Sequence, residues 1–172
     1  MYKSTELIMK EFDGKVKYIV AHTDSFECIV VGLALPGYPV RQLHYYCDEG
    51  NGVVVRLPEL LNNVSNENYV AVLQECNALT LDTGCLKFGI NDNMSVIAGY
   101  EFPEFTPDEG VGPMAFEIFL RVVKGFREFH DRLDNAAKVH TDQEKGPITF
   151  DEIEEMKSMN RRREKDDNNE SA

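Results

Sequence analysis

Residues 44–57, HYYCDEGNGVVVRL, consist of two runs of strand-forming residues on either side of a short acidic segment that contains glycine. Such a segment is a hairpin turn, a calcium loop or a catalytic corner. A two-residue turn at Asn51 and Gly52 would pair Cys47 with Arg56, and each face of the hairpin would then mix apolar and charged side chains. The side-chain pattern therefore disfavours that register.

A register shifted by one residue separates the apolar from the polar side chains. It predicts a three-residue loop, 49–51, or a frayed five-residue version of it. On one face Leu43, Tyr45 and Cys47 then lie opposite Leu57, Val55 and Val53. The other face carries two pairs, His44 with Arg56 and Tyr46 with Val54. Because a slip of one residue moves every side chain to the opposite face, burial of the apolar set favours this register.

A second hairpin is predicted over residues 85–102 by the same reasoning. A loop of residues 91–93 would place Ile90 opposite Met94 and Phe88 opposite Val96. Most side chains of the outer face are then polar, with Ile97 as the apolar exception. Lys87 and Glu101 share that outer face.

The remaining elements follow from apolar periodicity and from turn and cap residues. We expect a short first helix, strands before the first hairpin, a helical turn at Pro58, a helix between the hairpins and a long last helix. The approximate ranges are 3–13 for the first helix, 27–35 and 40–47 for the strands, and 65–77 for the helix between the hairpins. The long helix begins between residues 106 and 113 and ends near residue 138. Residues 16–22 are a further strand candidate. The fold class is α+β, an antiparallel sheet of about five strands with helices packed on it, in the order α-β-β-β-α-β-β-α.

We expect two regions, a folded domain over residues 1–140 and an acidic, disordered tail over 141–172. The long helix is apolar nearly all round in its first half, which indicates a partner surface or a deep groove. The net charge of −12 argues against a nucleic-acid partner, and no apolar run is long enough for a membrane helix. Four widely spaced cysteines and the lack of a signal segment predict a cytoplasmic protein with reduced thiols.

Metal binding and catalysis find little support in the sequence. Neither acidic turn has the ligand spacing of a calcium loop, and the cysteines and histidines lack the paired spacing of a zinc site. His22, Asp24 and Cys28 could be assembled on paper as a base, an acid and a nucleophile, but so could many other sets of three residues. We therefore predict no metal, no cofactor and no enzymatic activity.

An exposed surface is a better candidate for function. If the two hairpins share a sheet, one modestly apolar patch remains on its outer face, and such patches are typical of partner sites. Its residues are His44, Tyr46, Val54, Arg56 and Ile97. The alternative is that the first helix or the tail covers this patch.

The order of elements and several motifs resemble the YbjN family, whose members share the fold of type III secretion chaperones. The resemblance runs from about residue 5 to residue 135, and its clearest part is residues 53–103. Asn77 follows the family's helix-closing pattern, Lys87 and Phe88 match its "KF" strand, residues 91–93 match its acidic turn, and Phe102 with Pro103 ends the return strand. The resemblance implies a non-enzymatic and often dimeric protein.

Two functions follow as hypotheses. The first is a protein-binding module, chaperone-like or an adaptor, that acts as a homodimer and holds a client or partner protein. The second is a small enzyme or ligand sensor with a pocket between the long helix and the sheet, for which His22, Asp24 and Cys28 are the residues to test.

Overall fold

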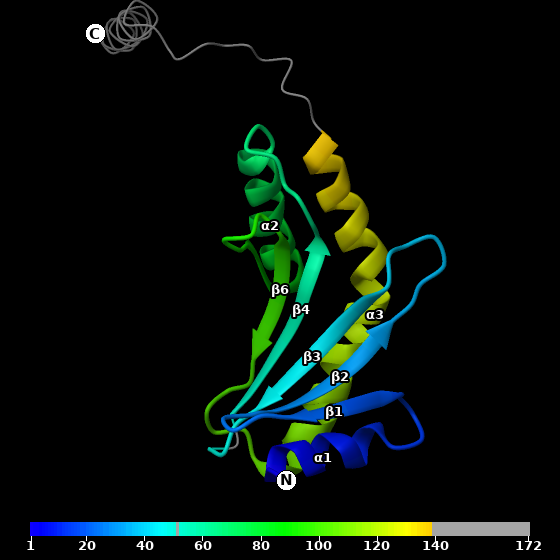
Figure 1. The fold of residues 1–172 in the computed structure, drawn as a ribbon, viewed down its shortest axis with the longest axis vertical. Coiled ribbons are helices and arrows are strands. Elements are labelled where there is room, and N and C mark those ends of the chain that lie inside the picture. The colour runs from blue at the N-terminus through cyan, green and yellow to red at the C-terminus, as the bar shows by residue number, and fades with distance from the viewer. Residues whose placement is uncertain (51, 139–172) are drawn as a thin grey trace, which may run out of the picture. The chain divides into compact units, whose positions relative to one another are not determined.

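A computed structural model describes residues 1–50 and 52–138 of the chain, and the predicted tail, 141–172, lies outside the described residues. The described part contains three helices and six strands (Figure 1). In chain order these are α1 (Lys3–Phe12), β1 (Tyr18–His22), β2 (Glu27–Leu33), β3 (Arg41–Cys47), β4 (Val53–Leu61), α2 (Tyr69–Thr83), β5 (Lys87–Ile90), β6 (Val96–Glu101) and α3 (Asp108–Lys138).

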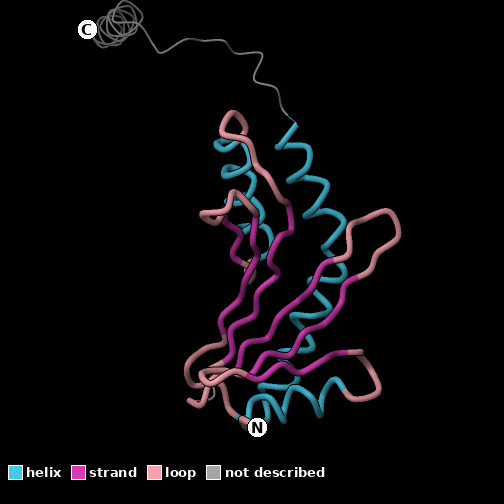
Figure 2. The backbone as a smooth tube through the Cα atoms, viewed as in Figure 1, coloured by secondary structure: helices cyan, strands magenta, loops and turns pink. Residues whose placement is uncertain are grey.

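The strands form one antiparallel sheet in the order β1-β2-β3-β4-β6-β5, and α3 passes behind it (Figures 1 and 2). This confirms the predicted α+β class with helices packed on an antiparallel sheet. The predicted element order has one strand too few, because the candidate at residues 16–22 does form a strand. That strand, β1, pairs with β2 at the margin of the sheet.

One face of the sheet is covered by the helices, and we call it the closed face. Its central residue is Tyr45, whose side chain is fully buried and donates a hydrogen bond from its hydroxyl group to the carbonyl oxygen of Ala115 at 3.0 Å. The ring of Phe12 meets the Tyr45 ring edge-on, with 5.4 Å between centroids. This cluster therefore ties α1 and α3 to the middle of the sheet.

Contacts within the domain explain why the first half of α3 is apolar nearly all round. Phe116 and Phe119 lie on the flank of α3 and contact Phe12 of α1 at centroid distances of 6.3 and 6.1 Å. Gly112 lets the two helices approach closely, because a Cβ atom there would lie 2.9 Å from the carbonyl oxygen of Leu7. The flank that indicated a partner surface or groove is thus covered in part by α1.

The first hairpin has the predicted register. Tyr45 pairs with Val55 and Cys47 with Val53, and the pair His44 and Arg56 takes the other face. The Asp48 amide donates to the carbonyl oxygen of Gly52 at 3.1 Å, and the Asp48 carboxylate accepts the Gly52 amide at 2.8 Å. The acidic side chain therefore closes the turn.

The loop of the second hairpin lies one residue further along the chain than predicted, which shifts the pairing of the two strands by two residues. Ile90 pairs with Val96, not with Met94. The Asn91 side chain accepts the amides of Asn93 and Ser95 at 3.1 and 3.0 Å, and Met94 takes a left-handed φ of 56°. The loop thus runs from residue 92 to 94 and keeps its predicted length of three. Since the register changes by two, each side chain keeps its predicted face.

The predicted helical turn at Pro58 is wrong, because β4 continues through Pro58 to Leu61. The strand absorbs the proline at an irregularity between Leu57 and Leu61, where Glu59 has a positive φ of 55°. Proline is tolerated in strands at such bulges. Leu57 and Leu60 are both buried, and their burial holds the segment on the sheet.

Candidate functional site: the open face of the sheet

The second face of the sheet, which we call the open face, is formed by the strand residues that alternate with the core residues. Strand pairing joins these residues into two rows that run across the sheet. The charged row consists of Ile19, Val30, His44, Arg56, Gly99 and Lys87. The tyrosine row consists of Ala21, Cys28, Tyr46, Val54 and Glu101. None of these residues belongs to the large hydrophobic cluster of the closed face, although Cys28 is itself buried.

The five residues predicted from the sequence all fall on this face. His44, Arg56, Tyr46 and Val54 occupy the two rows, and Ile97 alternates with the buried Val96 and Ala98 on β6. The predicted first helix does not cover them, because its buried apolar residues, Ile8 and Phe12, belong to the core on the closed face. The alternative that the tail covers this patch concerns residues 141–172, which lie outside the described part of the chain.

Hydrogen bonds hold the centre of the open face in a fixed arrangement. The Tyr46 hydroxyl group lies 2.9 Å from Nδ1 of His44, and the Gln42 side-chain oxygen lies 3.2 Å from Nε2. A neutral imidazole satisfies both contacts, with Nδ1 accepting and Nε2–H donating. Burial lowers the pKa of His44 from its usual 6.5, which favours the same neutral form.

Arg56 is the cation at the centre of the open face. Its guanidinium group lies over Gly99 of the neighbouring strand, so that a Cβ atom at position 99 would lie 2.3 Å from Nη1. Glycine at this position therefore leaves room for the arginine side chain. The result is a positive charge that lies flat on the sheet beside the half-buried Val54.

The sequence analysis missed a group of open-face residues on the β1–β2 side. Phe26 packs edge-on against Tyr46 at a centroid distance of 5.3 Å, and Ile19 is 67% exposed. Cys28, Val30 and Gly32 alternate with core residues along β2. Residues 28–31 form a continuous apolar run, so the sequence of this strand carries no alternation that would assign its residues to one face or the other.

The nucleophile, base and acid set is not assembled. His22 and Cys28 point to opposite faces, because His22 pairs with Glu27 and Cys28 pairs with Ala21. The Nδ1 atom of His22 lies 3.1 Å from the carboxylate of Glu27, and Asp24 lies in the turn between the strands. Burial raises the pKa of the Cys28 thiol to about 11, so this thiol is a poor nucleophile at neutral pH.

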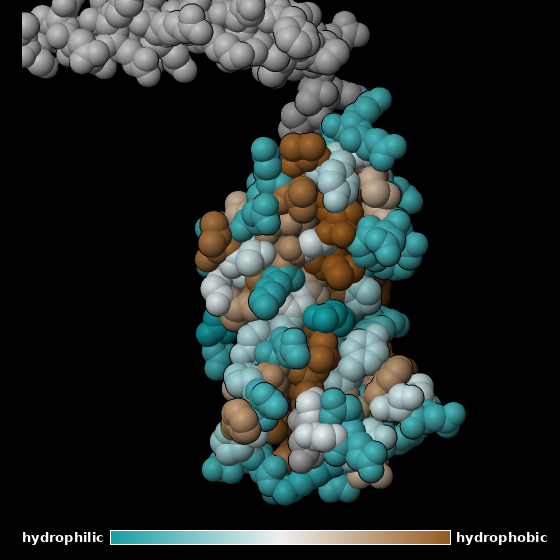
Figure 3. Space-filling view, turned by 90° about the vertical axis from the view of Figure 1, so that its left-hand side faces the viewer, coloured by the Kyte–Doolittle hydropathy of each residue, from teal (hydrophilic) through white to brown (hydrophobic). Residues whose placement is uncertain are grey.

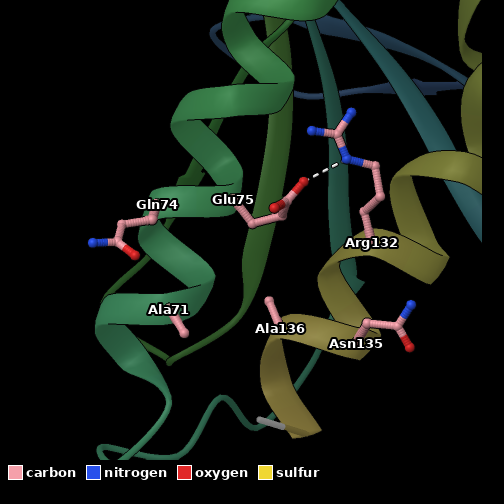
Figure 4. A pocket seen from close by; sticks show the side chains of 6 residues that line it. All are labelled: Ala71, Gln74, Glu75, Arg132, Asn135 and Ala136. Atoms are coloured by element: carbon pink, nitrogen blue, oxygen red, sulfur yellow. Dashed lines mark hydrogen bonds and ion pairs between the residues drawn. The ribbon is translucent and has the colours of Figure 1, made fainter.

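The second hypothesis places a pocket between α3 and the sheet, and the described residues form two hollows beside α3. One of about 490 Å³ lies between α2 and α3 and is lined by residues that include Ala71, Gln74 and Asn135 (Figure 4). Arg132 spans it and binds Glu75, with Asp82 at 2.8 Å and Glu128 at 3.3 Å. These ion pairs join the two helices and leave the Arg132 charge already matched.

A smaller hollow of about 220 Å³ lies where α3 passes the start of β5. Leu86 and Phe129 form its apolar wall, and Arg121 and Lys124 lie at its rim. A guanidinium nitrogen of Arg121 lies 3.7 Å from the sulfur of Cys85. This hollow combines an apolar wall with two cations, which is a lining that can hold a small ligand beside the long helix.

The outer side of α2 is the second uncovered surface. Val70 and Leu81 are 63% and 82% exposed, and the exposed amides Gln74 and Asn77 lie between them. The two acidic residues of this helix turn toward Arg132 instead. Figure 3 views the edge that carries α2 and β6, where apolar side chains (brown) gather in the upper half and continue down the middle.

Among the described helices, none is long and apolar enough to cross a membrane. Within the same residues, no three histidine, cysteine or acidic side chains are grouped as metal ligands would be. A scan against protein-family models finds no match for this chain, and a search of curated proteins finds no significant relative.

Proposed function

We propose that the protein is a non-enzymatic protein-binding module of the cytoplasm, chaperone-like in its use, and that the open face contacts the partner protein. One observation carries this proposal. The helices of the described part bury the closed face, whereas Tyr46, Val54 and Ile97 stay half-exposed on the open face beside Arg56. Aromatic residues and arginine are enriched where proteins bind one another.

The fixed geometry at the centre of the open face supports the same use. Tyr46 is held by His44 on one side and by Phe26 on the other. A side chain that is already ordered loses little conformational freedom on binding, so more of the contact energy appears as affinity. A surface with only a solvating role would not need this arrangement.

We further propose that the protein acts as a homodimer through the outer side of α2. Two chains of net charge −12 repel each other, and a shared interface must therefore avoid charged residues. Val70, Gln74, Asn77 and Leu81 form an uncharged, partly apolar stripe on an exposed side of this helix. The resemblance to the YbjN family, which also implies a dimer, stays a prediction.

Site-directed photocrosslinking tests the partner site. A benzophenone amino acid in place of Tyr46 should give polypeptide adducts in cells, and the same group in place of Lys124, on the exposed side of α3, should give few. Adducts that depend on position 46 and are competed by the unmodified protein support the proposal. Equal labelling from both positions, or none from position 46, contradicts it.

The small-ligand alternative keeps one specific place, the hollow beside Cys85 and Arg121. It predicts that a ligand would protect Cys85 from alkylation. The His22, Asp24 and Cys28 set gives this alternative no further support, because these side chains lie apart.

A further inference from the structure

Resting on the proposed function, we infer that the open face receives an acidic amphipathic helix of a partner protein. The first reason is charge. The face carries Arg56 and Lys87 in its charged row and Lys17 beside β1, whereas Glu101 is the carboxylate in the two rows. The chain as a whole has a net charge of −12, so this surface differs in sign from the protein around it.

The same charges argue against a second copy as the occupant. If two open faces met about a two-fold axis, the cations of each would lie near those of the other. Like charges brought together across an interface oppose association. A partner segment with carboxylates beside an apolar stripe would match both Arg56 and the neighbouring Tyr46 and Val54.

The second reason is the room left at two glycines. Gly32 and Gly89 lie on the open-face side of β2 and β5, and a Cβ atom at either position would meet nothing within 4 Å. Their φ angles are not in the left-handed region, so the backbone does not require glycine there. Glycine inside a strand weakens the strand and often marks the close approach of another backbone.

A hollow marks the Gly32 end of this surface. It has a volume of about 210 Å³ and is lined by Lys17, Tyr18, Ile19, Val30, Gly32 and Gln42. The open space at Gly32 can receive an aliphatic side chain, and Lys17, which also lines the hollow, can pair with a carboxylate. Apolar contact and charge are therefore offered side by side.

The third reason selects a helix over an extended segment. A strand laid flat on a sheet face would leave its own amides and carbonyl groups without partners, whereas a helix satisfies them internally. Helices are also the elements that bury an apolar stripe against a sheet face. The partner's helix would supply on the open face the layer that α3 supplies on the closed face.

Fluorescence anisotropy with three labelled helical peptides tests this inference on the full-length protein. The peptides share one leucine stripe and differ in the flanking residues, which are glutamate, glutamine or lysine. The glutamate peptide should bind tightest and weaken as salt is added. Gly32→Val and Arg56→Gln should each weaken it by about tenfold or more. The controls Gly110→Ala and Lys124→Gln, both on α3, should leave it unchanged.

Equal binding of the three peptides, preference for the lysine peptide, absence of binding, or full binding by both open-face variants would each overturn the inference. One outcome overturns this inference and leaves the proposed function standing. If the glutamine peptide binds as well as the glutamate peptide and Tyr46→Ser abolishes both, the open face still binds polypeptides and the acidic preference alone is lost. Unfolding midpoints of Gly32→Val and Arg56→Gln exclude misfolding as the cause of a loss.

Discussion

The closed and the open face of the sheet both carry aromatic side chains, but these side chains differ in how deeply they are buried. On the closed face, Tyr45 and Phe12 are fully buried and each touches several elements. On the open face, Tyr46 and Phe26 pack edge-on in a similar way but remain partly exposed. Packing explains the aromatic residues of the closed face. It does not require those of the open face, and the proposed function assigns them to a partner protein.

The largest expected contrast between the faces is in stability. Phe12→Ala removes a fully buried ring from the junction of α1, β3 and α3 and should lower the free energy of unfolding by about 3–5 kcal/mol. The matched change Phe26→Ala removes a half-exposed ring and should cost only about 1 kcal/mol. Urea unfolding measures both. Equal losses would mean that the open face is as tightly packed as the core.

Glycine substitutions should separate the faces with opposite signs. Gly112→Ala places a methyl group 2.9 Å from the Leu7 carbonyl oxygen, and forcing α1 and α3 apart should cost about 1–3 kcal/mol. Gly32→Ala meets open space and should leave stability unchanged or raise it by about 0.5 kcal/mol. Thermal and urea midpoints of the two variants give the comparison. A destabilised Gly32→Ala variant would show a local role that the contacts of Gly32 do not reveal.

The smallest expected effect concerns the pH dependence of stability. The pKa of His44 is lowered in the folded protein, so the unfolded chain takes up its proton first as the pH falls through about 6.5. Stability is therefore lost below that pH until the folded state also binds the proton. His44→Gln should lose less stability between pH 7 and pH 5 than the unchanged protein. Parallel losses in urea titrations at the two pH values would contradict this.

Side-chain alternation was enough to predict much of the fold. The register of the first hairpin and the faces of both hairpins could be predicted because a one-residue slip would expose Tyr45 and its neighbours. The loop of the second hairpin could not, because it depends on the Asn91 side chain binding the Ser95 amide. The continuation of β4 through Pro58 depends on a bulge whose cost is offset by burying Leu57 and Leu60.

The candidate site was only half predictable for a related reason. His44, Tyr46, Val54 and Arg56 belong to one hairpin, so local pairing places them together. The neighbours Ile19 and Val30 join them only through the pairing of β1, β2 and β3. The sequence analysis did not decide whether residues 16–22 form a strand of this sheet, so that pairing could not be predicted. The proximity of Arg56 to Gly99 is likewise a contact between strands that are distant in sequence.

The contact between Arg56 and Gly99 has a consequence for how charge on this surface is controlled. The identity of a residue on β6 determines where a cation attached to β4 can rest, since any side chain at position 99 would displace the guanidinium group. A single methyl group at that position would move the positive charge outward without removing it. The electrostatic character of the surface can therefore be retuned by a substitution that changes no charged residue.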